Sequence, residues 1–285
     1  MVSQRPLISR FAVWIDSHCH LDAAEFALDR DAVYAQAVAA GMTQCVVPSI
    51  SFRNCAEVLD CCQRYPVCVP AYGIHPIFVA QALPEDLDKL VDWLAIHPAV
   101  AIGEIGLDGS VVDQIGLGWD NQLFYFTAQL KLAQRFGLPV ILHVRRAIDE
   151  VCQALRRLPV KNGIKGGIAH AFNGSRQQAD ILISMGFKLG FGGAMTYSGS
   201  TRIRQLAKAL PLSAIVLETD APDIPPAWLD QQGVRGRNQP AELPAIAQVL
   251  ADLRGISVEE VLSVCATNTQ AVLHFSGEAY DQPPL

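Results

Sequence analysis

The hydrophobic residues of this chain gather in short runs, and amphipathic stretches separate one run from the next. Eight of these runs have the length and composition of β-strands and are bounded by turn-forming residues. Most are continuous rather than alternating, so each strand is expected to be covered on both faces, as in a parallel sheet. The predicted strands span residues 12–16, 44–50, 67–73, 99–106, 138–144, 166–170, 186–193 and 214–220.

The stretches between the strands carry helix signals. Ser51 can cap a helix over residues 52–65, and the apolar repeats of 121–137 and 175–186 each end in a glycine. Strands that alternate with helices eight times in 285 residues predict an α/β fold, a single (β/α)8 TIM barrel. A doubly wound sheet is the alternative.

The last part of the chain closes the predicted barrel. Residues 223–240 are rich in Pro, Gly and Arg and are long enough to cover a barrel mouth, and 241–255 and 257–275 have the pattern of closing helices. No linker that would separate a second domain stands out. The expected organisation is an N-terminal extension at 1–11, a barrel domain at 12–276 and a C-terminal tail at 277–285.

Composition limits the possible partners. The net charge of -6 argues against coating duplex DNA through bulk positive charge, but not against a nucleic-acid end that enters a local metal site. Eight cysteines without a C-x-x-C pair predict free thiols in a reducing compartment. The N-terminus lacks the apolar stretch of a secretory signal, and no run approaches a membrane span. We therefore expect a cytoplasmic protein, with no membrane association and no obligate protein partner.

Ionisable residues stand where several predicted strands end. His18 and His20 follow the first strand, and two residues apart in an extended segment they point to the same side. On its own this motif is weak, since a polar turn after a strand would look the same. Glu104 lies among apolar residues of the fourth strand, so its carboxylate must bind metal or pair with a Lys or Arg.

His143, His170 and Asp220 end the fifth, sixth and eighth predicted strands. Taken singly, such histidines are often hydrogen-bonded structural residues, and such an aspartate often caps a helix or a turn. Taken together with the previous group, five strand ends deliver a metal-competent side chain to one face of a barrel. Four histidines and two carboxylates exceed what one catalytic zinc uses, so they predict two ions with a bridging carboxylate and hydrolytic chemistry.

With these residues in place, the sequence resembles the TatD family of metal-dependent deoxyribonucleases among the amidohydrolase-like TIM barrels, and in particular its YjjV-type branch. The motifs run in the family's order over nearly the whole chain after residue 11. They are "DSHCHLD", "GIHP", "AIGEIGLD", "LPVILHVRRA", "AHAFNGS", "ETDAPD" and "RNQP".

The resemblance implies roles for the candidate ligands. They are His18, His20 and Asp220 for one ion, His143 and His170 for the other, and Glu104 as the bridge. A water activated by the ions would be the nucleophile, and Asp220 would take its proton. Cys19, between the two histidines, is expected to point away from the ions.

Other matching residues have less certain roles. His75 in "GIHP" is a candidate for phosphate contact, with a turn histidine before Pro76 as the alternative, and Arg145 could clamp an anion. Two departures from the family pattern weaken inference about the substrate. The chain continues after "GEIGLD" as "GSVVDQIGLGWDNQ", without the family's aromatic residues, and Gln239 replaces the usual Glu of Asn-Glu-Pro.

The function implied is a divalent-metal-dependent hydrolase, a deoxyribonuclease of the 3′-5′ exonuclease type that uses two ions such as Mg, Mn or Zn. Its partners would be DNA ends or a small phosphorylated substrate. The alternatives are a hydrolase of a small phosphoester, amide or lactone on the same barrel, and a non-catalytic metal-binding protein. Basic residues that could help to hold phosphates are Arg145, Arg146, Arg202, Arg204, Arg235 and Arg237.

Overall fold

Each of the eight predicted apolar runs overlaps a strand, and strands that are neighbours in sequence pair in parallel in one eight-stranded sheet. The computed structural model describes residues 13–158, 163–231 and 234–273. The strands are β1 Trp14–Asp16, β2 Met42–Pro48, β3 Cys68–Tyr72, β4 Ala101–Asp108, β5 Val140–Arg145, β6 Gly167–Ala169, β7 Phe187–Phe191 and β8 Ile215–Leu217. The segments predicted at 1–11 and 277–285 lie outside the described residues.

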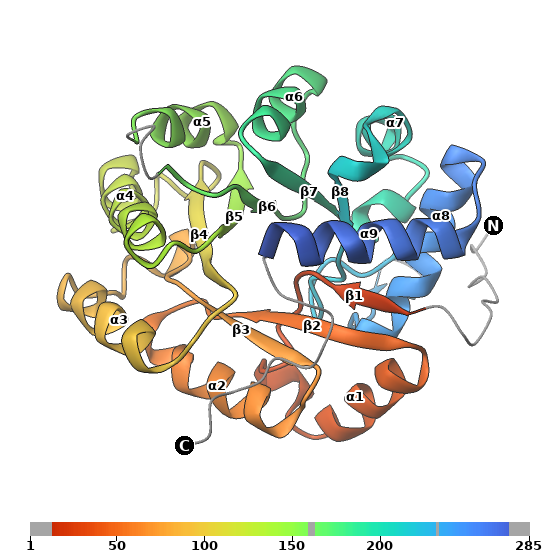
Figure 1. Cartoon of the computed structure of the whole chain (residues 1–285), viewed down its shortest axis with the longest axis horizontal. Helices are drawn as coiled ribbons and strands as arrows, with labels where there is room; N and C mark the ends of the chain where they lie inside the picture. Colours follow the sequence, from red (N-terminus) through yellow and green to blue (C-terminus); the bar gives the residue numbers. More distant parts are fainter. Residues whose placement is uncertain (1–12, 159–162, 232–233, 274–285) are drawn as a thin grey trace.

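Helices surround the sheet, as the amphipathic stretches predicted (Figure 1). They are α1 Arg30–Ala39, α2 Cys55–Arg64, α3 Glu85–Ile96, α4 Trp119–Phe136, α5 Ile148–Arg156, α6 Arg176–Ser184, α7 Thr201–Ala209, α8 Leu243–Arg254 and α9 Val258–Leu273. This arrangement confirms the (β/α)8 barrel and excludes the doubly wound alternative, because a doubly wound sheet does not keep its strands in sequence order.

The predicted caps are present. The Ser51 side chain accepts a hydrogen bond from the backbone N–H of Asn54 in a short turn that leads into α2. Helix α4 ends at Gly137, whose φ of 66° lies in the left-handed region that favours glycine. Helix α6 is followed by Gly186, whose φ of 87° lies in the same region, and a capping box between Ser175 and Gln178 that was not predicted begins this helix.

The barrel closes between β1 and the segment after β8 through main-chain hydrogen bonds. The N–H of Ser17 donates to the carbonyl of Leu217 at 3.0 Å, and the N–H of Asp220 donates to the carbonyl of His18 at 2.9 Å. Helix α9 lies across this seam and packs its apolar side chains against β1 and β8 (Figure 1). The seam therefore fixes the two chain segments that carry half of the predicted ligands.

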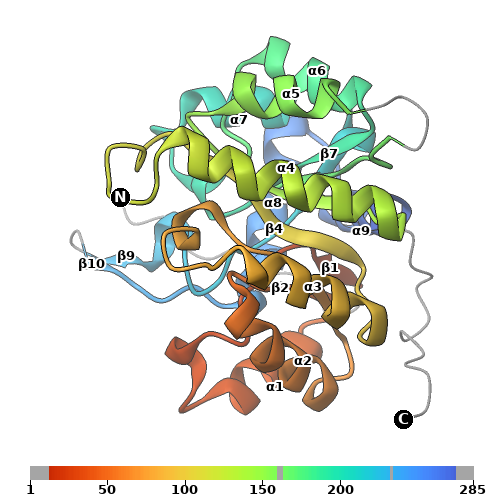
Figure 2. The ribbon, with the colours of Figure 1, turned by 90° about the vertical axis from the view of Figure 1, so that its left-hand side faces the viewer.

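The loop at 223–240 contains structure that the sequence pattern did not predict. A two-residue strand β9, Asp230–Gln231, pairs antiparallel with β10, Val234–Arg235, and this hairpin projects from the body of the barrel (Figure 2). Arg237 anchors the loop, because its guanidinium pairs with Asp29 at 2.6 Å and lies 4.7 Å from the ring centre of Phe26.

Two further predictions concern the whole chain. All eight cysteines are free and buried, as the absence of a C-x-x-C pair predicted. Among the residues that the structure describes, no helix combines the length and apolar character needed to cross a bilayer.

Candidate metal centre

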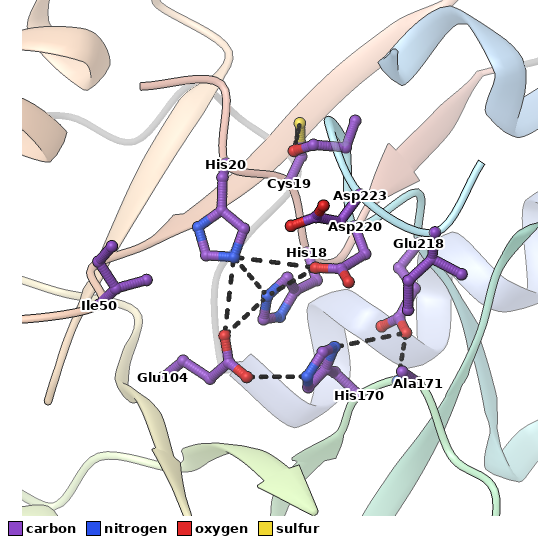
Figure 3. A network of polar contacts seen from close by, with 12 residues as sticks. His18, Cys19, His20, Ile50, Glu104, His170, Ala171, Glu218, Asp220 and Asp223 are labelled. Carbon is purple, nitrogen blue, oxygen red and sulfur yellow. Dashed lines mark hydrogen bonds and ion pairs between the residues drawn. The ribbon is translucent and has the colours of Figure 1, made fainter. Parts of the chain in front are cut away.

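Six of the residues singled out in the sequence meet at one end of the barrel. Strand by strand they are His18 and His20 after β1, Glu104 in β4, His143 in β5, His170 after β6 and Asp220 after β8. Parallel strands present their carboxyl ends together, which is why residues so far apart in sequence come within contact distance. Figure 3 shows Glu104 between the histidines of β1 and the histidine of β6, with the sulfur of Cys19 directed away from them.

The Oε2 atom of Glu104 faces one group of side chains. The Nε2 atom of His18 lies 3.1 Å from it and the Nε2 atom of His20 lies 3.7 Å from it. The Oδ1 atom of Asp220 completes the group, 3.4 Å from Nε2 of His18 and 3.8 Å from Nε2 of His20. We call His18, His20 and Asp220 the first half-site.

The Oε1 atom of Glu104 faces a different group. The Nε2 atom of His170 lies 2.8 Å from it and the Nδ1 atom of His143 lies 3.1 Å from it. These two ring nitrogens are 3.4 Å apart. We call His143 and His170 the second half-site, so that Glu104 offers one carboxylate oxygen to each half-site.

His75 also points into the cluster. Its Nε2 atom lies 3.3 Å from Oε1 of Glu104, and the side chain is buried. Its Nδ1 atom accepts a hydrogen bond from the backbone N–H of Ile77 at 3.1 Å, so the ring proton of the neutral imidazole is on Nε2. His75 therefore reaches the site as a hydrogen-bond donor. That geometry fits a contact with an anion better than metal ligation.

The imidazoles set the charge of Glu104. Burial opposes ionisation of this carboxyl group, but His170, His75 and His18 outweigh it and hold the pKa of Glu104 well below its usual range. The effect is mutual for His170. Burial disfavours its charged form, yet the carboxylate of Glu104 raises the pKa of His170 to about 10. Without an ion, the second half-site therefore holds protons.

The first half-site is less basic. Burial lowers the pKa of His18 to about 3 and, across the cluster, that of His75 to about 4. Burial raises the pKa of Asp220 to about 6, and the nearby histidines limit that rise. A divalent ion binds imidazoles that are neutral and carboxylates that are ionised, and a neutral His18 beside an ionisable Asp220 meets this requirement.

Two carboxylates that the sequence analysis passed over touch the second half-site. Asp108, at the end of β4, lies with Oδ2 3.2 Å from Nε2 of His143. Glu218 lies with Oε1 3.9 Å from Nδ1 of His170. A signal for Asp108 was available, because residues an even number apart on a strand share a side, and Asp108 follows Glu104 by four residues within β4.

The segment after β6 is bent to meet Glu218. The backbone of Ala171 has a φ of 44°, unusual for a residue with a Cβ atom, and its N–H donates to Oε1 of Glu218 (Figure 3). Asp220 has a φ of 56° in the same region of the site. Such conformations persist where the surrounding structure holds them, and they gather at functional sites.

The arginines are placed less centrally. Arg145 is exposed at the end of β5, outside the buried cluster, and a role in anion binding stays a prediction. Arg146, the next residue, is also exposed. Three others have partners within the fold, since Arg202 donates to Asn173, Arg204 to the carbonyl of Met195 and Arg237 to Asp29. The side chain of Arg235 lies outside the described part of the structure.

The donor set fits divalent ions. Three groups in this cluster each bring three ligand atoms within 4.8 Å of one another: His18, His20 and Asp220; His18, Glu104 and His170; and His75, Glu104 and His143. Buried imidazoles and carboxylates in this number are costly unless they share protons or cations. That the six residues are metal ligands is a prediction that their geometry supports.

A (β/α)8 barrel with this donor set at its carboxyl end defines the class of metal-dependent hydrolases built on TIM barrels. Residues 15–274 match the family model for TatD related DNase. The chain is 35% identical over 271 residues to the metal-dependent hydrolase YjjV of Escherichia coli (strain K12), covering 94% of this chain and 99% of that protein. This protein belongs to the TatD related DNase family and is a metal-dependent hydrolase.

Other relatives extend the comparison. The chain is 30% identical over 258 residues to the 3′-5′ ssDNA/RNA exonuclease TatD of Salmonella typhimurium (strain LT2), covering 90% of this chain and 97% of that protein. The crystal structure of the E. coli YjjV protein, a TatD homologue, superposes with a TM-score of 0.83 at 34% identity, over 92% of this chain and 98% of that chain. A TatD family hydrolase from Entamoeba histolytica has a TM-score of 0.80 at 22% identity, over 93% of this chain and 99% of that chain, which shows the shared fold.

Proposed function

We propose that this protein removes nucleotides from the 3′ end of single-stranded DNA by hydrolysing phosphodiester bonds with two divalent ions. The observation that carries the proposal is that Glu104 turns one oxygen toward each half-site, as a carboxylate between two ions would. The substrate is supported by the relative from Salmonella typhimurium, which is named a 3′-5′ ssDNA/RNA exonuclease.

In this proposal each half-site would hold one ion. His18, His20 and Asp220 would hold the first, and His143 and His170 the second. Ions held in this way would lower the pKa of a water molecule and stabilise negative charge on a phosphoryl oxygen. Mg²⁺, Mn²⁺ and Zn²⁺ all accept nitrogen and carboxylate ligands, so their identity must be measured.

Asp220 is the residue placed to take a proton from the attacking water. Burial raises the pKa of its carboxyl group to about 6, so at neutral pH the group is ionised but is a stronger base than an exposed aspartate. The main-chain hydrogen bond from its N–H to the carbonyl of His18 fixes the segment against the first half-site. The imidazoles around Glu104 hold its pKa well below the usual range, so this carboxylate stays ionised near neutral pH.

His75 and Arg145 are the proposed substrate contacts. His75 offers an Nε2–H group inside the site, where it can donate to a non-bridging phosphate oxygen. Arg145 is exposed at the end of β5 and can pair with a neighbouring phosphate. A chain with a net charge of -6 is expected to use few such contacts, so its binding should depend only weakly on salt.

A single-turnover degradation assay tests this proposal. Protein loaded with Mg²⁺, Mn²⁺ or Zn²⁺ is incubated with a 5′-labelled single-stranded oligonucleotide, and products that shorten stepwise from the 3′ end are expected. A matched oligonucleotide with phosphorothioate linkages at its 3′ end should be cleaved much more slowly. The same protein is assayed in parallel on RNA strands and on small phosphoesters, amides and lactones. The cleavage rates then rank these substrate classes.

Two variants control the assay. Asp220→Asn removes the proposed base and should abolish cleavage, whereas Asp180→Asn makes the same chemical change on the exposed face of α6 and should leave it intact. The proposal is wrong if folded, metal-loaded protein leaves every oligonucleotide whole with each of the three ions.

A further inference from the structure

The Asp108 carboxylate is held in one orientation on both of its oxygens. Oδ1 accepts hydrogen bonds from the backbone N–H of Ser110 at 2.8 Å and from the Ser110 hydroxyl at 2.5 Å. Oδ2 lies 3.2 Å from Nε2 of His143. The side chain is only 3% exposed, so water does not compete for these positions.

The main chain of Asp108 is clamped as well. Gln122 of α4 is fully buried, and its Oε1 accepts from the N–H of Asp108 at 2.8 Å while its Nε2 donates to the carbonyl of Asp108 at 3.1 Å. A second bond from the same amide nitrogen to the carbonyl of Leu117 fixes the Gln122 side chain. Asp108 can therefore neither rotate nor shift without breaking buried hydrogen bonds.

This clamp keeps a proton on the Nε2 atom of His143. An ionised carboxylate only accepts, so the ring nitrogen that faces Oδ2 of Asp108 must be the donor. That leaves Nδ1, which faces Oε1 of Glu104 at 3.1 Å, as the nitrogen with a free lone pair once an ion replaces its proton. Ligating histidines in metalloproteins are commonly oriented by such a carboxylate on the far ring nitrogen.

We propose that Asp108 is a positioning residue for the second half-site, which keeps the proton of His143 on Nε2 so that Nδ1 is presented to a divalent ion. The inference rests on the proposed two-ion function but concerns metal binding rather than nuclease activity. In the first half-site Nδ1 of His18 is buried without a hydrogen-bond partner, so no carboxylate orients that ring as Asp108 orients His143. Loss of Asp108 should therefore affect one ion more than the other.

The Asp108→Asn variant reverses the hydrogen-bond pattern while keeping the shape. The backbone N–H of Ser110 can only donate, so the amide oxygen must stay beside Ser110 and the amide NH₂ must face His143. Nε2 of His143 then has to accept, which moves the ring proton to Nδ1. The metal-free protein stays fully hydrogen-bonded, because Nδ1–H can donate to Glu104, but the nitrogen that faces the second half-site is blocked.

The Asp108→Ala variant separates this effect from packing. Alanine removes the carboxylate and leaves His143 free to place its proton on either nitrogen. If Asp108 served only to fill space, alanine would impair both stability and metal binding more than the isosteric asparagine. If Asp108 sets the tautomer, alanine destabilises the fold more, but asparagine weakens metal binding at least as much.

The experiment measures ion binding in chelator-treated protein by equilibrium dialysis against Mn²⁺ and Zn²⁺, with circular dichroism and unfolding midpoints recorded for each variant. Wild type is expected to bind two ions, and Asp108→Asn to keep one while its affinity for the other falls about 10- to 100-fold. Imidazole ¹⁵N chemical shifts of the metal-free proteins should show His143 protonated on Nδ1 in Asp108→Asn. Asp180→Asn, which makes the same chemical change on the exposed face of α6, should bind both ions as wild type does.

The outcomes distinguish the two proposals. The role of Asp108 is overturned if Asp108→Asn binds both ions as tightly as wild type. It is also overturned if Asp108→Ala loses more ion affinity than Asp108→Asn does, whatever the nuclease assay gives. Two bound ions with no cleavage of any oligonucleotide overturns the proposed function and leaves the role of Asp108 standing. A wild-type chain that binds neither ion overturns both.

Discussion

His75 and Glu104 meet at 3.3 Å, with Nε2 of the imidazole facing Oε1 of the carboxylate. His170 and His143 approach the same oxygen, so by distance alone His75 would count as a third ligand of the second half-site. The hydrogen bond from the N–H of Ile77 to Nδ1 of His75 argues otherwise, because it leaves the ring proton on Nε2. His75 and His143 therefore face the same carboxylate oxygen with different predicted roles. His75 is a hydrogen-bond donor, and His143 is a metal ligand.

We predict that His75→Ala keeps the metal content of wild type and loses activity. Removing one preorganised donor from a phosphoryl oxygen costs about 100-fold in turnover. Metal content per chain and single-turnover rates of the same preparation check this result. His143→Ala is the matched comparison and should lose one ion. A His75→Ala protein that lacks an ion would mean that His75 is a ligand.

Metal binding is predicted to release protons and to strengthen as the pH rises. Burial disfavours the charged forms of His170 and His143, but Glu104 raises the pKa of His170 to about 10, and Asp108 and Glu104 together raise the pKa of His143. The His170 ring is therefore protonated in the metal-free protein at neutral pH, and the raised pKa of His143 favours a proton there too. Because an ion needs the lone pair that the proton occupies, the affinity rises by up to about tenfold for each unit of pH and each displaced proton until the pH passes the pKa of that group.

Asp220 adds a second pH range. Burial raises its pKa to about 6, so below that pH a further proton must leave the first half-site and affinity should fall more steeply. Competition against a metal indicator from about pH 5 to about pH 9 measures the slope. Calorimetry in buffers of different ionisation enthalpy counts the protons released. An affinity that stays constant across neutral pH would contradict the protonated state of His170.

The fold could be predicted from sequence because its signal is local. Each strand is a buried apolar run, and observed strands differ from predicted ones by a few residues at the ends, as for β4 at Ala101–Asp108 against 99–106. The β9–β10 hairpin was missed because two-residue strands carry no hydrophobic pattern. Arg237 is a candidate for phosphate contact by sequence, and no local pattern indicates that Asp29, far away in the chain, pairs with it.

The site could be predicted as a set of residues but not as a geometry. The apolar neighbours of Glu104 and the ends of the other strands were enough to single out this carboxylate and four of the five histidines that surround it. Which oxygen of Glu104 faces which histidine depends on side-chain rotamers and on the register of five strands, and no local pattern encodes either. Asp108 and Glu218 were overlooked because an acidic residue after a strand is also a common turn or cap residue.

Gly190 on β7 is predicted to be required by Glu218. A Cβ atom at Gly190 would lie 2.6 Å from the carboxyl carbon of Glu218, a side chain that is itself buried. Gly190→Ala should push this carboxylate off the N–H of Ala171 and destabilise the protein by about 1–3 kcal/mol. Gly199 is the matched control, because nothing lies within 4 Å of its added Cβ. Urea unfolding of both variants tests this, and equal midpoints would contradict it.

Thr219 is predicted to stabilise the seam that closes the barrel. Its hydroxyl donates to Oδ2 of Asp16 at 2.6 Å and accepts from the N–H of Ala221 at 3.2 Å, and both Asp16 and Thr219 are fully buried. Thr219→Val keeps the shape of the side chain but leaves a buried carboxyl oxygen and a buried N–H without that partner. Each such loss costs about 1–3 kcal/mol.

The expected result is a lower free energy of unfolding for Thr219→Val in chelator-treated protein, together with weaker ion binding in the first half-site. The second effect follows because the seam carries His18 and Asp220, whose segments are joined by the hydrogen bond from Asp220 N–H to the carbonyl of His18. Thr267→Val is the control, since that hydroxyl bonds only a carbonyl one turn back on the exposed side of α9. It should change stability by no more than about 0.5 kcal/mol. If the two variants unfold alike, the seam is held by its main-chain bonds alone.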